Sequence, residues 1–167
     1  MRYDWSITLV NEICKQLKRK FTGSGKRFLG IDFGEIRIGV ALSDVERTIA
    51  TPYKMLANKS FKILMPEIVN IVREMDVGAI IFGLPLQFDG TEGATAEKVR
   101  NFATFLRKYL DEAEFSDVDI AFVDESHSSQ IAEEMLVTKF DMGRQKRKEI
   151  LDKIAAAEIL QRVLDIV

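Results

Sequence analysis

The sequence has a single cysteine, Cys14, and a single histidine, His127. One thiol cannot form an internal disulfide, and it cannot build a zinc site based on several cysteines. A chain with so little cysteine is most simply placed in a reducing compartment. We therefore expect a cytoplasmic protein.

Long apolar runs are also absent, since no stretch approaches the roughly 20 apolar residues of a membrane span. The N-terminus carries Asp4 and Glu12 among short apolar groups and lacks the compact apolar core of a signal peptide. The 167 residues include only three prolines, with 47% apolar and 30% charged residues, which is typical of one soluble globular domain. We expect no contact with a membrane.

A strong net charge is a further absence, because the formal charge of −2 neither requires nor forbids a polyanionic partner. Cationic side chains nevertheless gather in two clusters that flank a mostly acidic segment, residues 111–134. The clusters comprise Lys15, Lys18, Arg19, Lys20, Lys26 and Arg27, and Arg144, Lys146, Arg147, Lys148 and Lys153. Each cluster is either a solvated helix face or a surface that contacts phosphates.

Hydrophobic periodicity predicts a helix, three antiparallel strands, and then alternating helices and strands. Five helices are predicted. The first covers 5–21, the second has Pro66 in its first turn and ends near Asp76, and the third runs from about Val99 to Leu110. A short fourth helix follows Ser128 or Ser129, and the last covers about 148–166. The predicted strands are 28–32, 37–43, 48–53, 77–82 and 119–123, and residues 141–147 are predicted to form a polar loop. This order favours a mixed α/β sheet with helices on both faces and a site at the C-terminal ends of strands.

Four carboxylates stand near the ends or buried faces of these elements, namely Asp32, Asp124, Glu125 and Asp152. Taken singly, they could be a hairpin residue, the start of a loop and an acid near a helix N-terminus. If they converge, they raise one another's pKa values unless a divalent cation keeps them ionised. Magnesium suits such hard oxygen ligands, and a pair of ions about 4 Å apart can catalyse phosphodiester hydrolysis.

Several motifs are specific enough to indicate a family. They are GIDFGEIRIGVALSD at 30–44, ATP at 50–52, IIFGLPLQFDGTEG at 80–93, FVDES at 122–126 and DKIAAAEILQ at 152–161. Together they resemble the YqgF/RuvX family, whose members are similar to Holliday junction resolvases and are described as nucleases of pre-16S rRNA. The resemblance covers about residues 28–165.

This resemblance implies a ribonuclease H-like nuclease domain at 28–167, preceded by an N-terminal helical extension and linker at 1–27. It also implies a phosphodiesterase site of the two-metal type that uses Mg²⁺, with Mn²⁺ as a substitute. The implied catalytic residues and metal ligands are Asp32, Glu125 and Asp152, with Asp124 as a further candidate ligand. The implied nucleic-acid contacts are Arg37, Arg144, Lys146, Arg147 and Lys148. The implied role is processing of the 5′ end of pre-16S rRNA, on RNA or on a ribosomal precursor particle.

The chain departs from the family pattern at Ser126, where an arginine is common, and this weakens an expected phosphate contact unless His127 or another cation replaces it. Two other functions therefore stay open: resolution of branched DNA, and nucleic-acid binding without catalysis in ribosome assembly. An ATPase of the sugar-kinase type is disfavoured, because it needs two domains and a cleft between them. Neither the choice between RNA and DNA nor the oligomeric state follows from the sequence.

Overall fold

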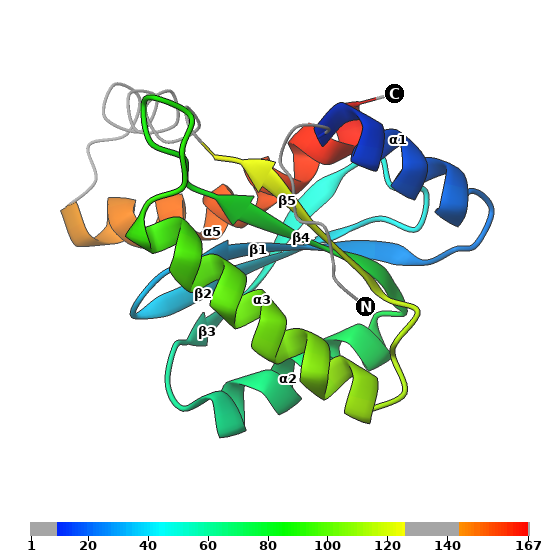
Figure 1. Cartoon of the computed structure of the whole chain (residues 1–167), viewed down its shortest axis with the longest axis horizontal. Coiled ribbons are helices and arrows are strands. Elements are labelled where there is room, and N and C mark those ends of the chain that lie inside the picture. The colour runs from blue at the N-terminus through cyan, green and yellow to red at the C-terminus, as the bar shows by residue number, and fades with distance from the viewer. Residues whose placement is uncertain (1–9, 126–143, 167) are drawn as a thin grey trace.

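The computed structural model describes residues 10–125 and 144–166 (Figure 1). Their elements are α1 (Val10–Phe21), β1 (Arg27–Phe33), β2 (Arg37–Ser43), β3 (Ala50–Ala57), α2 (Phe61–Glu74), β4 (Val77–Leu84), α3 (Ala94–Glu112), β5 (Asp119–Asp124) and α5 (Arg144–Asp165). This order confirms the predicted alternation. The short helix predicted after Ser128 lies outside the described residues. No helix in the described part of the chain is both long and apolar enough to cross a membrane.

The five strands form one mixed sheet in the order β3-β2-β1-β4-β5. β1, β2 and β3 pair antiparallel as a meander, whereas β4 pairs parallel to both β1 and β5. β4 is buried along its whole length, as expected for a central strand covered on both faces. The C-terminal ends of β1, β4 and β5 consequently lie together along one side of the sheet, here called the carboxyl edge.

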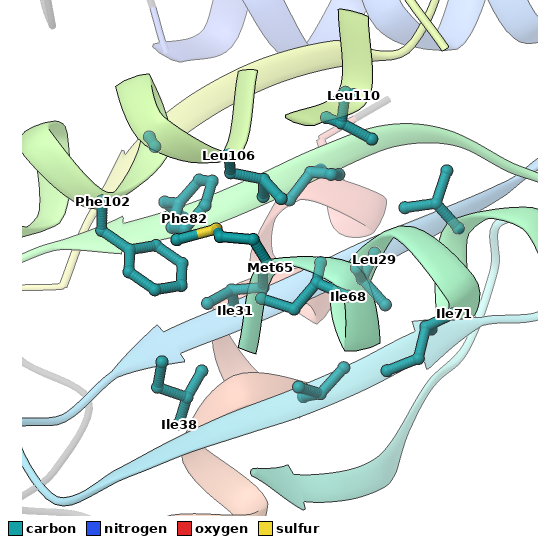
Figure 2. Packing of buried hydrophobic residues seen from close by; sticks show 14 of the residues in the cluster. Leu29, Ile31, Ile38, Met65, Ile68, Ile71, Phe82, Phe102, Leu106 and Leu110 are labelled. Carbon is teal, nitrogen blue, oxygen red and sulfur yellow. The ribbon is translucent and has the colours of Figure 1, made fainter. Parts of the chain in front are cut away.

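Helices cover both faces of the sheet, which confirms the predicted architecture (Figure 1). α2 and α3 pack on one face around Phe82 and Phe102, whose ring centroids lie 6.0 Å apart. Figure 2 shows these rings surrounded by aliphatic side chains from β1, β2, α2 and α3. α1 and α5 pack on the other face. The sheet is therefore held rigidly, and so are residues at its carboxyl edge.

Helix α1 joins the core on the same face of the sheet as α5 by burying Cys14, Leu17 and Phe21. The Phe21 ring packs edge-on against Phe28 of β1, with centroids 5.6 Å apart. The Lys18 ammonium donates a hydrogen bond to the carbonyl of Leu164 near the end of α5. The described part of the N-terminal extension thus packs directly on the sheet.

Several element boundaries differ from the prediction, and three of these differences have a clear physical reason. Pro66 lies in the second turn of α2 rather than the first, because the helix already begins at Phe61. This position is exposed, so water can satisfy the carbonyl that the missing proline N–H leaves free. β3 covers Ala50–Ala57 because it pairs with the whole of β2. Finally, residues 144–147, predicted to form a loop, begin α5.

The close contact between β1 and α5 depends on Gly30. A Cβ atom at this position would lie 2.7 Å from the Ala156 carbonyl oxygen and 2.8 Å from the Leu160 Cβ. Both atoms belong to the helix framework, so α5 would have to move. We expect Gly30→Ala to lower the free energy of unfolding by about 3 kcal/mol, measured by urea denaturation.

Gly93→Ala is the matched control for this substitution. The added Cβ at position 93 would meet chiefly the side chain of Gln87, with the amide nitrogen at 2.6 Å. A flexible side chain can rotate away, so this variant should lose much less stability. Equal losses in the two variants would show that the backbone of α5 does not press on β1.

Candidate active site

Asp32 lies near the C-terminal end of β1, where it pairs with Gly39 of β2. The turn that follows is tight at Gly34, because a Cβ there would lie 2.4 Å from the Arg37 carbonyl oxygen. The Asn58 side-chain amide donates a 2.8 Å hydrogen bond to the Gly34 carbonyl. The turn is therefore fixed from both sides, and it holds the half-buried Asp32 at the carboxyl edge.

Glu125 comes to the same place from β5. Its backbone N–H donates a 3.1 Å hydrogen bond to the Leu84 carbonyl, which extends the pairing of β4 with β5 by one residue. A Cβ on Gly83 would lie only 3.1 Å from Glu125 Oε2, so the missing side chain at position 83 leaves room for the carboxylate. The Glu125 side chain forms a hydrogen bond with that of Asp32.

The structure thus distinguishes between the two adjacent acids that the sequence left undecided. Strand residues alternate between the faces of a sheet, so Asp124 and Glu125 point in different directions. Glu125 is partly buried and meets Asp32, whereas Asp124 is exposed at the end of β5. We refer to Asp32 and Glu125 as the acid pair.

In the absence of a metal, the environment of the acid pair favours binding of one proton, shared between Asp32 and Glu125. Burial raises the pKa of Glu125 to about 7, and the negative charge of Asp32 and its hydrogen bond add to the increase. Arg162 opposes this effect, and Asp124 contributes a smaller increase. The acid pair in the absence of a cation therefore carries less than its full negative charge at neutral pH.

The acid pair fits a divalent cation by its chemistry. Carboxylate oxygens are the donors that Mg²⁺ and Mn²⁺ prefer, and a cation would remove the repulsion that raises the Glu125 pKa. Within residues 10–125 and 144–166, no cluster of three or more acidic, histidine or cysteine residues that could hold a metal is formed by described side chains. The side chain of Asp152 is outside that description, so its part in the site stays a prediction.

Asp152 lies in α5 one turn before the residues that pack on β1. Ala156, one turn later, packs its backbone against Gly30, two residues before Asp32. Figure 1 shows α5 beginning on the side where β1 and β4 end. The backbone arrangement therefore brings the turn that contains Asp152 near the acid pair.

The predicted basic contacts have two locations. Arg37 is exposed and begins β2, directly after the turn that follows Asp32. The other four residues lie in the first two turns of α5 rather than in a loop, namely Arg144, Lys146, Arg147 and Lys148. Their side chains are outside the described part of the structure. Ser126 and His127 lie outside the described range.

Sequence reasoning missed Arg162. Its guanidinium donates a 3.1 Å hydrogen bond from Nη1 to the Asp124 carbonyl, and its charge acts on both Glu125 and Glu158. The helical interval of three residues from Ile159 would have placed it on the face of α5 that reaches the sheet. Arg162 thus adds a positive charge beside the acid pair.

Comparison of the amino-acid sequence with known proteins identifies the family of this chain. Residues 26–166 match the family described as RuvX: Holliday junction resolvase. The chain belongs to the RuvX family. One relative, from Endomicrobium trichonymphae and named "Putative pre-16S rRNA nuclease", is 44% identical over 140 residues, which cover 84% of this chain and 96% of the relative. A relative of the same name from Paramagnetospirillum magneticum is 40% identical over 140 residues, which cover 84% of this chain and 86% of the relative.

Solved structures show the same fold at much lower identity. RuvC of Thermus thermophilus has a TM-score of 0.50 and 12% identity, covering 83% of this chain and 93% of its own. The fowlpox virus Holliday junction resolvase has a TM-score of 0.50 and 11% identity, covering 84% and 99%. This likeness confirms the ribonuclease H-like fold of the RuvX chain.

The raised pKa of Glu125 leads to a prediction about stability in the absence of metal. The folded protein holds this proton up to about pH 7, whereas the unfolded chain releases it near the ordinary value of 4.5. The favourable contribution is therefore complete below pH 4.5 and is lost as the pH rises through 7. With EDTA at pH 8, Glu125→Gln should raise the free energy of unfolding by about 2 kcal/mol.

Denaturation at pH 4.5 and pH 8 measures this effect, and the gain from Glu125→Gln should disappear at the lower pH. Glu112→Gln, at an exposed position on α3, is the control and should leave the stability unchanged at both values. A Glu125→Gln variant that is no more stable than the wild type at pH 8 would contradict the burial of a protonated acid pair.

Proposed function

We propose that the protein is a metal-dependent endonuclease that hydrolyses phosphodiester bonds in structured nucleic acid and processes the 5′ end of pre-16S rRNA. The observation that carries the proposal is the acid pair: two carboxylates from β1 and β5 meet at the carboxyl edge in a RuvX-family chain. Relatives at about 40% identity carry the name of a pre-16S rRNA nuclease, which supports this substrate.

Asp32, Glu125 and Asp152 would hold the metal, and Asp124 at the rim of the site is a further candidate ligand. Mg²⁺ or Mn²⁺, as one ion or a pair, would supply Lewis-acid polarisation of the phosphate and charge neutralisation at the leaving oxygen. A cation held between the two carboxylates would lower the raised pKa of Glu125 and keep this side chain ionised as a ligand. The rigid β1 and β5 ends keep both carboxylates in place without reorganisation.

Cations around the carboxyl edge would bind the substrate backbone. Arg37 is exposed directly beside the β1–β2 turn. The start of α5 adds Arg144, Lys146, Arg147 and Lys148. Such contacts position a nucleic acid without reading its sequence and weaken as salt increases.

Branched DNA is the second candidate substrate, favoured by the description of the matched family as Holliday junction resolvases. Both substrates offer the same phosphodiester to the same acids. The two substrates differ in the shape of the nucleic acid and in the 2′-hydroxyl groups of RNA, and we find no base-reading motif among the described residues.

A cleavage assay on two labelled substrates tests the proposal. Purified protein is incubated with a pre-16S rRNA fragment that spans the 5′ processing site and, separately, with a four-way DNA junction, each with Mg²⁺, Mn²⁺ or EDTA. We expect cleavage of the RNA with either ion and none with EDTA. Preferential cutting of the junction would assign the second candidate, and binding without cleavage in all conditions would contradict an enzymatic role.

A further inference from the structure

The loop of residues 85–93 joins β4 to α3 and starts beside the acid pair. Its first residue follows Leu84, whose carbonyl accepts the hydrogen bond from the Glu125 N–H at 3.1 Å. Figure 1 shows this loop, in green, standing at the edge where β5 ends. The loop therefore borders any substrate that reaches the acid pair.

Hydrogen bonds within the loop fix its conformation. The Gln87 N–H donates to the Thr91 carbonyl at 2.8 Å, and the Gly90 N–H donates back to the Gln87 carbonyl at 2.9 Å. The Asp89 carboxylate accepts from both the N–H and the hydroxyl of Thr91, at 3.0 and 2.6 Å. Gly90 has a φ of 81°, which favours glycine. Phe88 lies within the turn that Gln87, Asp89, Gly90 and Thr91 close by these hydrogen bonds.

The base of the loop is anchored to α3. Leu86 and Glu92 form an isolated β-bridge across the loop. The Glu92 carboxylate accepts hydrogen bonds from Arg100 Nε at 2.6 Å and from its Nη2. The Arg100 guanidinium in turn stacks over the Phe122 ring, 4.7 Å from its centroid. The loop is thus built on the core rather than loosely attached.

This anchored loop presents Phe88 fully to solvent. Its relative exposure is 110%, the highest of the large apolar residues in the described part of the chain, and Ile36 follows at 76%. Ile36 lies in the turn after β1, so the two residues stand at the ends of the neighbouring strands β1 and β4. The fully exposed aromatic ring of Phe88 offers a face on which a nucleobase can stack.

The charges of the loop show which part of a nucleic acid fits against it. Residues 85–93 contain two carboxylates, Asp89 and Glu92, and neither lysine nor arginine. Glu92 is paired with Arg100, so Asp89 supplies the negative charge that is not balanced within the loop and its anchor. Hydrogen bonds from Thr91 lower the pKa of Asp89, so it is ionised at neutral pH. An anionic loop repels the phosphate backbone, whereas a neutral nucleobase can stack on an aromatic ring.

We propose that Phe88 stacks on an unpaired nucleobase close to the cleaved phosphodiester, so that the protein selects sites flanked by an unpaired nucleotide. This inference rests on the proposed function and adds the substrate class. Phe88 lies four positions after Leu84, a reach of at most about 14 Å, which corresponds to a few nucleotides. Bases stacked inside a continuous duplex do not expose their faces and cannot make this contact.

The affinity of Phe88 variants for single-stranded and duplex RNA tests this inference. All proteins carry Asp32→Asn so that the RNA stays intact, and binding is followed by fluorescence anisotropy with Mg²⁺ present. Phe88→Ala should weaken binding to the single strand roughly tenfold and binding to the duplex less than twofold. Phe88→Trp should retain the affinity of the parent protein. Ile63→Ala, 65% exposed on α2, is the control and should change neither affinity.

A 2-aminopurine base in the single strand gives a direct signal of stacking, because its fluorescence is quenched when it stacks. The parent protein should quench it and Phe88→Ala should not, while both unfold at the same temperature. Equal affinities and equal quenching in these two proteins would overturn the inference and leave the nuclease proposal intact. Failure of the parent protein to bind any RNA or DNA would overturn both.

Discussion

Replacement of Asp32 by asparagine is expected to reduce the cleavage rate by roughly 1,000-fold or more while the protein stays folded. The amide would keep the size of the side chain but remove the negative charge that a divalent cation needs. The charge of Asp32 also raises the pKa of Glu125, so its loss should relieve repulsion in the metal-free protein. Single-turnover cleavage of the pre-16S rRNA fragment measures the rate, and thermal unfolding with EDTA checks the fold.

Arg37→Gln provides a comparison from the same edge. Arg37 is exposed and is assigned here to backbone binding, so its loss should act mainly on substrate affinity and on the salt dependence of binding. A cleavage rate for Asp32→Asn within tenfold of the wild type would contradict the assignment of Asp32 to the catalytic centre.

Glu125→Gln should cause a loss of cleavage comparable to that of Asp32→Asn, whereas the neighbouring Asp124→Asn should cost about tenfold or less. The difference is expected because the two side chains point in different directions. Glu125 hydrogen-bonds to Asp32, whereas Asp124 is exposed at the rim of the site. The measurement is kcat/KM on the same RNA, because a lost metal ligand and a lost rim charge affect kcat and KM differently.

The two variants form a matched pair, since each changes one carboxylate to its amide at adjacent positions. If Asp124→Asn were the inactive variant and Glu125→Gln the active one, the contact seen between Glu125 and Asp32 would not be the catalytic arrangement. Similar large losses in both would indicate that Asp124 is also a ligand.

Much of the fold could be predicted because its signals are local. The continuous apolar run at 77–82 identified the central strand, and the short β-prone run at 37–43 identified β2 with its observed bounds. Pro66 misled the prediction of α2, because the packing of α2 against the sheet outweighs the cost of a proline in an exposed turn.

The sequence suggested acidic residues for the candidate site but could not give their contacts. Motif spacing selected Asp32, Asp124 and Glu125, yet it could not say which of the two adjacent acids points inward, because that depends on the last paired residue of β5. Arg162 was missed because its contact with the Asp124 carbonyl joins segments 38 residues apart. The exposure of Phe88 likewise depends on the turn made by Gln87, Gly90 and Thr91.

The most direct test of the account is the binding of Mn²⁺, measured by isothermal titration calorimetry at pH 7.5 on the wild type and on the Asp32→Asn, Glu125→Gln and Asp124→Asn variants. We predict saturable binding to the wild type and at least roughly tenfold weaker binding to both variants, with Asp124→Asn less affected. Undetectable binding to the wild type, or equal affinity in all four proteins, would contradict the claim that the acid pair at the carboxyl edge is a metal-dependent catalytic centre.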